Sequence, residues 1–453
     1  MTIKSSLILI NPWIYDFAAY DLWSKPLGLL QLAGFLRNHG FKIDLIDCMD
    51  THHPDMENDS AYKKPVRRDF GTGKYWRKKV AKPSVLSHIP RQYSRYGLSD
   101  DIFLAELEKV SQPTAILVTS LMTYWYPGVI EAIRMARQIH PHVPVFLGGI
   151  YARLCHDHAT RNSGADFVIS QAGSLALLLE LLGARGIIKP SKPQVSEMKD
   201  YPAFDLLKGI DYICISTSSG CPLRCRYCAS NYLTPDYTRR HPMKVLEEII
   251  FWHLKYGLRD FAFYDDALLM ESDTHIKILL ENLIQRHLNL RFHTPNAMHV
   301  KQITPQLARL MYQAGFRTIR LGFETSNFIL HKELDNKFLE GDFEQAVNSL
   351  LKAGFTSHDI GAYILVGLPD QDMDSVMESI DYVGSTGIMP YLAEYSPIPH
   401  TSLWEKALLY SSYDLISEPL FHNNSILPCW EHEKIMALPD IKKRVFQIRQ
   451  EGR

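Results

Sequence analysis

Three cysteines packed into eight residues constrain this chain more than any other feature of its sequence. The segment is Gly220-Cys221-Pro-Leu-Arg-Cys225-Arg-Tyr-Cys228, directly after a predicted strand at residues 213–217. The chain has 7 cysteines, and an odd number with this spacing is a poor disulfide framework. Three thiolates so placed can hold a [4Fe-4S] cube and leave one iron open to a small molecule. A zinc site, the alternative, would need a fourth Cys or His at finger-like spacing.

Length and composition set the class of protein. With 453 residues the chain is too long for one core and fits two or three domains. Apolar residues make up 46% and charged residues 22%, which is typical of a globular protein. The net charge of −1 gives no overall attraction to nucleic acid or to an anionic membrane. We find no apolar run of the roughly 18 residues that a spanning helix needs and no signal-peptide pattern. We therefore expect a cytoplasmic protein with no membrane span.

The hydrophobic pattern predicts two α/β domains. Residues 1–190 alternate strand and helix patterns, as in a doubly wound, Rossmann-like sheet. A second alternation over residues 205–398 gives six βα units, which is a partial (β/α)6 barrel. Residues 184–200, rich in Lys and Pro, resemble a linker, and residues 399–453 form a short C-terminal extension. The predicted strands are 6–10, 41–47, 114–120, 143–147 and 166–170, then 213–217, 261–264, 290–293, 318–323, 359–366 and 392–395.

An insertion at residues 51–112 interrupts the first domain. Between Ala61 and Gly97 it has eleven Lys and Arg residues and one acid, Asp69, interleaved with aromatic residues. A basic, aromatic loop could bind a nucleic-acid strand. The simpler interpretation, which we favour, is an insertion that covers the active site or docks on the second domain, with its charges solvated or paired.

Four segments follow the cysteine segment at the ends of successive predicted strands: Phe263-Tyr-Asp265-Asp266, Thr294-Pro295-Asn296, Leu321-Gly-Phe-Glu324-Thr325 and Ile364-Leu-Val-Gly367-Leu-Pro369. With the cysteine segment, in this order, they resemble the radical S-adenosylmethionine (SAM) superfamily. The resemblance implies that Cys221, Cys225 and Cys228 bind a [4Fe-4S] cluster whose open iron chelates SAM. Reduction would then cleave SAM to methionine and a 5′-deoxyadenosyl radical. Taken singly, Glu324 could instead form an ion pair within the barrel, and Asn296 could cap a helix. The residues that the resemblance places at SAM are Tyr227 beside the adenine, Asp265 and Asp266 after the second strand, Asn296 after the third, Glu324 at the fourth, and Gly367 and Pro369 at the fifth.

The first domain is similar to the cobalamin-binding domain of the B12-associated radical SAM subfamily. The similarity implies a cobalamin site at the carboxyl ends of the strands, formed by Ser120, Gly148 and Gly149. The chain has no Asp-x-His-x-x-Gly segment and so offers no histidine as a lower cobalt ligand, which members of this subfamily do without. The sheet could otherwise bind substrate or nothing. The similarity rests on Asn11-Pro12, Pro26-Leu-Gly-Leu-Leu, Leu147-Gly148-Gly149 and Gly173-Ser174.

Together the two resemblances imply a cobalamin-dependent methyltransferase that acts on a small-molecule or lipid precursor. One SAM would methylate the cobalt and a second would supply the radical. The electron would come from a reductant such as flavodoxin or ferredoxin. Two alternatives stay open. One is a radical SAM enzyme of another reaction type, a rearrangement, cyclisation or cleavage without functional B12. The other is an RNA-modifying radical SAM enzyme that grips RNA with residues 61–97.

Three further positions have two interpretations each. Cys429, beside Trp430, could approach the cluster, carry a methyl group or donate hydrogen, but a packed thiol is the simpler interpretation. Glu394 and Tyr395 either contact substrate or close the barrel. The Tyr124-Trp-Tyr126 segment either borders a corrin or caps a helix.

Overall fold

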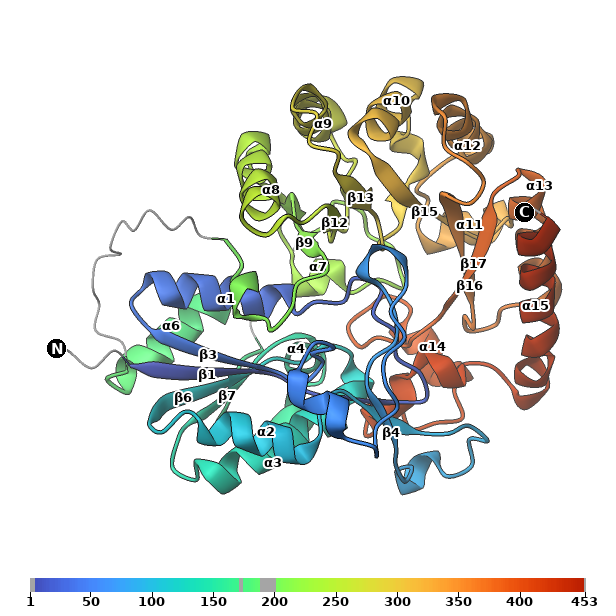
Figure 1. Ribbon diagram of the computed structural model, residues 1–453. Helices are drawn as coiled ribbons and strands as arrows, with labels where there is room; N and C mark the ends of the chain where they lie inside the picture. Colours follow the sequence, from blue (N-terminus) through green and yellow to red (C-terminus); the bar gives the residue numbers. More distant parts are fainter. Residues whose placement is uncertain (1–4, 171–173, 188–200, 452–453) are drawn as a thin grey trace. The chain divides into compact units, whose positions relative to one another are not determined.

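The computed structural model describes residues 5–170, 174–187 and 201–451, and the chain divides into two compact units. Unit 1 comprises Met1–Asp211 with Ile416–Phe421, and unit 2 comprises Tyr212–Leu415 with His422–Arg453. Each unit is built on its own parallel sheet (Figure 1), which confirms the predicted α/β class. Gly173 and most of the predicted linker at 184–200 lie outside the described residues.

Unit 1 contains the predicted doubly wound sheet. Its five strands are parallel in the order β3-β1-β6-β7-β8. Alternate side chains of β1 enter two different cores, because helices cover both faces of the sheet: Ile8 belongs to one and Leu9 to the other. The order reverses between β1 and β6, and ligands of such sheets bind beyond the carboxyl ends of the strands at that point. The elements are β1 (Ser6–Asn11), α1 (Leu27–Asn38), β3 (Lys42–Asp47), β6 (Pro113–Val118), α3 (Tyr126–Ile139), β7 (Val145–Leu147), α4 (Ile150–Leu154), α5 (His156–Asn162), β8 (Phe167–Val168) and α6 (Ser174–Ala184).

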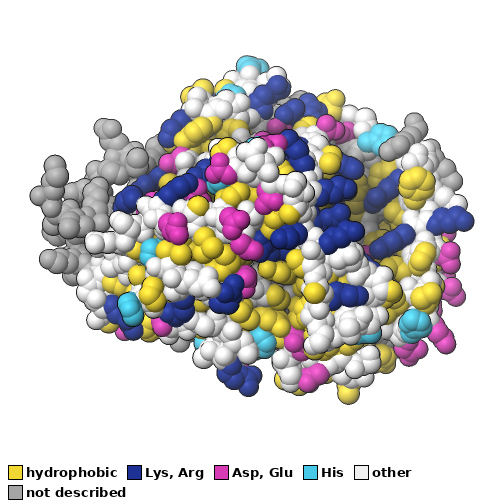
Figure 2. Space-filling view, turned by 60° about the horizontal axis from the view of Figure 1, so that its bottom comes forward, with side chains coloured by type: hydrophobic (Ala, Val, Ile, Leu, Met, Phe, Trp, Pro, Cys, Tyr) yellow, Lys and Arg dark blue, Asp and Glu magenta, His cyan; other side chains and the backbone are white. Residues whose placement is uncertain are grey.

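The insertion packs within unit 1 with most of its aromatic side chains inward. Its strands β4 (Arg77–Lys79) and β5 (Ser94–Tyr96) form a small antiparallel sheet with β2 (Ile14–Asp16), which precedes the insertion in the chain, and it ends in α2 (Asp100–Glu108). Most of its Lys and Arg side chains are exposed or half-buried, whereas Arg95 is only 4% exposed. Figure 2 shows a group of Lys and Arg side chains on the face that is in view. Buried rings cannot stack on bases, so the structure favours the interpretation as a packed insertion. The rings that are at most 7% exposed are Tyr62, Tyr75, Trp76, Tyr93 and Tyr96.

Unit 2 is the predicted partial (β/α)6 barrel. Six parallel strands run in the order β17-β16-β15-β13-β12-β9, and β14 pairs with the carboxyl-terminal half of β15. The helices begin and end where the sequence indicates: the Thr304 side chain accepts from Leu307 N at the start of α10, and Gly315 ends it with φ 101°. The elements are β9 (Ile213–Ile215), α8 (Pro242–Tyr256), β12 (Asp260–Phe263), α9 (Ile276–Gln285), β13 (Arg291–His293), β14 (Met298–His299), α10 (Pro305–Ala314), β15 (Phe316–Glu324), α11 (Phe328–Leu334), α12 (Asp342–Ala353), β16 (Ile360–Val366), α13 (Met373–Ser385) and β17 (Met389–Glu394).

The C-terminal residues cover the open edge and the mouth of this barrel. After α14 (Trp404–Tyr410), the long helix α15 (His432–Glu451) lies along β17, where Arg449 donates to the Pro390 carbonyl. Between them, the Trp430 indole donates to Leu368 O at 3.2 Å, just beyond β16. Across the described ranges no helix combines the length and the apolar character that crossing a membrane requires.

Candidate functional site

The three cysteines of the motif lie on one loop after β9, which we call the cysteine loop (residues 217–230). Cys221 is buried, whereas Cys225 and Cys228 are half-buried, and all three are free thiols. The middle of the loop is tied to α11 by a hydrogen bond from Arg226 N to Leu334 O. Among the described residues no three Cys, His, Asp or Glu side chains have the geometry of a metal centre. The loop therefore places the three thiols close together in the sequence without preassembling a metal centre.

The chemistry of the loop suits an iron–sulfur cluster. Burial raises the pKa of the Cys225 thiol to about 12 and also raises that of Cys221, while the Lys337 charge lowers both. The Ser230 backbone N–H points at Cys228 Sγ from 3.4 Å and would support a thiolate there. Metal binding deprotonates thiols, so three cysteines, two of which feel the charge of the buried Lys337, fit a cluster with one open iron.

Asp265 holds the start of the cysteine loop. Its buried carboxylate accepts from the N–H and the hydroxyl of both Thr217 and Ser218, at 2.6 to 3.0 Å. Burial raises its pKa, and these four donors oppose that shift. In this structure the carboxylate that we expected to face SAM is occupied by the loop that carries the cysteines.

Asp266 and Asn296 lie beside the same loop. Asp266 Oδ2 accepts from Ser230 Oγ at 2.8 Å, and this hydroxyl is 3.3 Å from Cys228 Sγ. Burial raises the pKa of Asp266. The exposed Asn296 side chain donates to Tyr264 O at 3.0 Å, so it braces the chain next to Asp265 and does not cap a helix.

A buried cluster around Lys337 joins the cysteine loop to β15. Lys337 Nζ donates to Tyr227 Oη at 2.6 Å, to Glu324 Oε1 at 2.9 Å and to Asp335 Oδ2 at 2.9 Å. The side chains of Lys337, Glu324 and Asp335 are 7%, 6% and 0% exposed. His331 Nε2 lies 3.0 Å from the second oxygen of Asp335. Glu324 thus forms an ion pair within the barrel, one of the two interpretations given above.

Lys337 and Asp335 were missed by sequence reasoning. Nothing in the local pattern distinguishes them from surface charges, because the segment 335–337 is a polar turn whose partners come from distant parts of the chain. Burial would raise the pKa of Asp335, but His331 and Lys337 lower it to about 2. Burial and the neighbouring Glu324 charge raise the pKa of Tyr227 well above its usual range. The ring that we placed beside adenine is therefore a neutral phenol held by charged partners.

Gly367 and Pro369 form a tight, buried turn at the end of β16. Gly367 has φ 96°, and its N–H donates to the Gln371 side chain at 2.9 Å. A Cβ at Gly367 would lie 2.7 Å from the Leu427 side chain. The C-terminal segment therefore packs directly on the turn that we expected to lie under adenine.

In unit 1, Ser120, Gly148 and Gly149 meet at the carboxyl ends of β6 and β7. The Ser120 hydroxyl donates to Gly148 O at 2.6 Å, and Gly149 has φ 94° with its α-carbon against Ser120. A Cβ on Gly148, by contrast, would meet nothing within 4 Å. The structure brings these three predicted residues together and leaves open backbone surface at Gly148. Nearby, Tyr126 stacks on Tyr151 at 5.7 Å and donates to Glu418.

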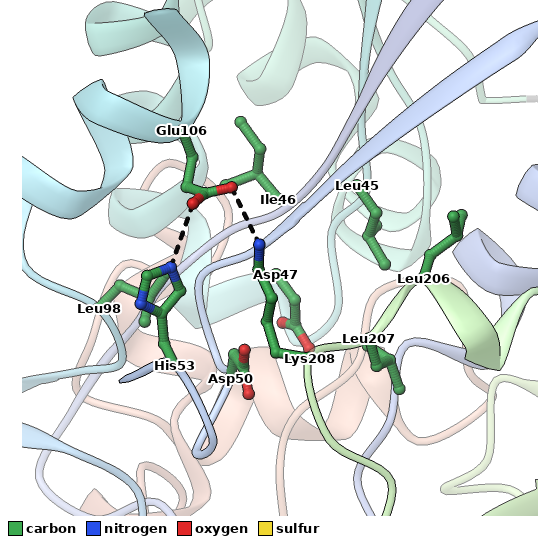
Figure 3. Close-up of a pocket in the computed structure, with 10 residues that line it drawn as sticks. All are labelled: Leu45, Ile46, Asp47, Asp50, His53, Leu98, Glu106, Leu206, Leu207 and Lys208. Atoms are coloured by element: carbon green, nitrogen blue, oxygen red, sulfur yellow. Dashed lines mark hydrogen bonds and ion pairs between the residues drawn. The ribbon is translucent and has the colours of Figure 1, made fainter. Parts of the chain in front are cut away.

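A narrow recess, with a cavity volume of only about 10 Å³, lies next to the carboxyl end of β3 (Figure 3). His53, Glu106 and Lys208 are joined across it, with His53 Nε2 and Lys208 Nζ each 3.3 Å from a Glu106 oxygen. Asp47, the last residue of β3, accepts from Asn11 at 2.7 Å. Burial raises the pKa of Asp47 to about 6. Sequence reasoning did not single out this polar recess, because its members come from four separate segments.

Three further positions singled out from the sequence, Cys429, Glu394 and Tyr395, pack within unit 2. Cys429 is 4% exposed, and burial raises its pKa to about 12, as expected for a packed thiol. Glu394 pairs with Lys442 of α15 at 3.1 Å, which fits closure of the barrel edge. The Tyr395 hydroxyl is buried and has no hydrogen-bond partner among the described residues.

Comparisons with known proteins agree with both units. Residues 215–383 match the model of the radical SAM superfamily, and residues 94–178 match the B12 binding domain. The chain is 24% identical over 345 residues to an uncharacterized methyltransferase of Pyrococcus horikoshii, covering 69% of this chain and 74% of that protein. It is 21% identical to the anaerobic magnesium-protoporphyrin IX monomethyl ester cyclase of Rubrivivax gelatinosus, covering 72% of this chain and 66% of that protein.

One solved structure shows the same fold over most of the chain. It is the radical S-adenosylmethionine methyltransferase TsrM from Kitasatospora setae with cobalamin and a [4Fe-4S] cluster bound. The TM-score is 0.64 at 15% sequence identity, and the alignment covers 89% of this chain and 78% of TsrM. The order of a B12-binding fold followed by a radical SAM fold is therefore common to both proteins.

Proposed function

We propose that this chain, a radical SAM enzyme with an N-terminal B12-binding domain, is a cobalamin-dependent methyltransferase of a small-molecule or lipid precursor. The observation that carries the proposal is the combination, in one chain, of a three-cysteine loop after the first barrel strand with a doubly wound sheet open at Gly148. The similarity to an uncharacterized methyltransferase and to TsrM supports it.

The residues of the chain have distinct roles in this proposal. Cys221, Cys225 and Cys228 hold the [4Fe-4S] cluster, which a reductant such as flavodoxin or ferredoxin supplies with electrons. When bound, the cluster and SAM supply a radical, and cobalamin supplies the methyl group. Asp265 fixes the start of the cysteine loop, and Lys337 fixes Tyr227 and hence the loop's end. Both side chains keep the loop in place while the thiols bind iron.

A second candidate is a radical SAM reaction without methyl transfer. The similarity to the monomethyl ester cyclase favours it, because that protein is named for a ring closure. An RNA-modifying role has less support, because the aromatic rings of the insertion are buried. The first two candidates share the cluster and SAM and differ in whether a methyl group reaches the product.

The test uses anaerobically reconstituted full-length protein, with and without hydroxocobalamin, and Cys225→Ala as the control. We expect cluster absorbance and 5′-deoxyadenosine only with Cys225 intact, together with cobalamin that stays bound through gel filtration. A cluster without retained cobalamin would contradict the methyltransferase proposal and favour the second candidate. Absence of a cluster under every condition would refute both.

A further inference from the structure

Arg320 lies on the inner face of the barrel, nearer to the amino end of β15 than the Lys337 cluster. Successive side chains of a strand point to opposite faces, and Phe323 of β15 packs outward on Phe343 of α12 at 4.4 Å. Arg320, three residues earlier, therefore shares the inner face with Gly322 and Glu324. It lies two residues, or roughly 7 Å, from Gly322 toward the amino end of the strand. Arg320 is only 9% exposed.

A second arginine approaches the same place from the C-terminal helix. The guanidinium carbon of Arg320 lies 4.2 Å from the centre of the Tyr391 ring, and that of Arg449 lies 4.0 Å from the same centre. Gly361 makes room for this stack, because a Cβ there would lie 2.4 Å from the Tyr391 ring. Arg449 also donates to Pro390 O at 2.7 and 3.0 Å, which fixes its orientation.

Neither guanidinium has an acidic partner. Within the described ranges, no Asp or Glu lies at ion-pair distance from Arg320 or Arg449. Burial lowers the pKa of Arg449, and the neighbouring Arg320 charge lowers it further. Contact with an aromatic ring offsets part of the cost of burying a cation, but two like charges at one ring still repel each other. A bound anion would remove that repulsion.

We propose that Arg320 and Arg449 form an anion site against Tyr391 on the inner face of the barrel, and that it takes a carboxylate or phosphate group of the substrate. A guanidinium presents paired N–H donors in a plane, which matches both oxyanions. The assignment of the anion to the substrate rests on the proposed function. The existence of the anion site does not depend on that function.

The experiment is isothermal titration calorimetry of the full-length chain with sodium phosphate and, separately, sodium acetate, at constant ionic strength set with chloride. We expect saturable binding of at least one of the two anions. Arg449→Gln should weaken it about tenfold or more, because a hydrogen bond to a charged group is lost. Arg449→Lys should fall in between. Arg444→Gln is the matched control, since Arg444 lies on the same helix but pairs with Asp381 at 2.6 Å.

The outcomes separate the two proposals. Binding of phosphate alone indicates a phosphate-bearing substrate, and binding of acetate alone a carboxylate-bearing one. No saturable binding of either anion, or equal affinity in wild type and Arg449→Gln, would overturn the anion site. Arg449 is half-buried on α15, so we expect Arg449→Gln to fold, and this variant decides the question. SAM cleavage by the same preparations reports on the proposed function independently.

Discussion

Replacing Lys337 by methionine tests how the cysteine loop is held. The substitution keeps the length of the side chain and removes one charge and three hydrogen bonds, to Tyr227, Glu324 and Asp335. It leaves two buried carboxylates facing each other with no cation between them. Removing one partner of a buried ion pair costs about 3–5 kcal/mol, because the remaining charge stays buried. We expect a cost at the lower end of this range, because Tyr227 still donates to Glu324 and His331 still contacts Asp335.

A loss of about 3 kcal/mol corresponds to roughly a 100-fold change in a local opening equilibrium. Hydrogen exchange of the backbone amides in β15 and the cysteine loop measures that opening in unit 2 alone. We expect those amides to exchange roughly 100-fold faster in Lys337→Met, and amides of unit 1 to be unchanged. Lys332→Met, at an exposed position of α11, is the matched control and should stay near wild type.

The pH dependence gives a second signature of the same mechanism. In wild type, Lys337 and His331 keep the pKa of Asp335 near 2, so the acid is charged throughout the neutral range. Without Lys337, one of the two groups that lower the pKa of Asp335 is gone, and protonation of Asp335 would relieve its repulsion with the Glu324 carboxylate. The loss of protection in Lys337→Met should therefore be smaller at pH 5 than at pH 8. Exchange less than threefold faster than wild type at pH 8 would refute the reasoning.

Four other substitutions test the remaining parts of the sites. Asp265→Asn should lower the iron content after reconstitution, because an amide leaves at least one buried donor unpaired at a cost of about 1–3 kcal/mol; unchanged iron would contradict the role of Asp265. Gly149→Ala should destabilise unit 1 in a thermal melt, because at φ 94° its Cβ would lie 2.2 Å from Ser120 O. Gly148→Ala should fold normally, because its Cβ would meet nothing within 4 Å. This second variant should lose cobalamin on gel filtration only if the corrin binds against Gly148. Burial raises the pKa of Asp47 from 3.8 to about 6, so stability falls as the pH rises through this interval and stays low above it. Asp47→Asn should therefore raise urea stability most at pH 8, less at pH 5 and least at pH 3.

The fold was predictable because it depends on local pattern. Apolar side chains recur with a strand or helix period at residues 6–10, in the helix from Pro26 and in the six βα units. A parallel sheet covered by helices buries these apolar faces. The site was predictable only in part. Cys221, Cys225 and Cys228 are close in sequence, whereas Lys337 reaches Tyr227 across 110 positions and carries no signal of its own. Arg449 lies even farther along the chain from Arg320, and only the closure of the barrel edge by α15 brings both to one ring.

The contacts of the cysteine loop suggest how it can accept a cluster without refolding. Asp265 holds its start, Arg226 ties its middle to Leu334 and Leu403, and Lys337 holds Tyr227 near its end. These anchors grip backbone groups, hydroxyls and one phenol, and none of them uses a cysteine sulfur. The thiols can therefore move to meet iron while the loop stays in place. It follows that changing a cysteine should abolish the cluster and spare the barrel, whereas changing an anchor should weaken both.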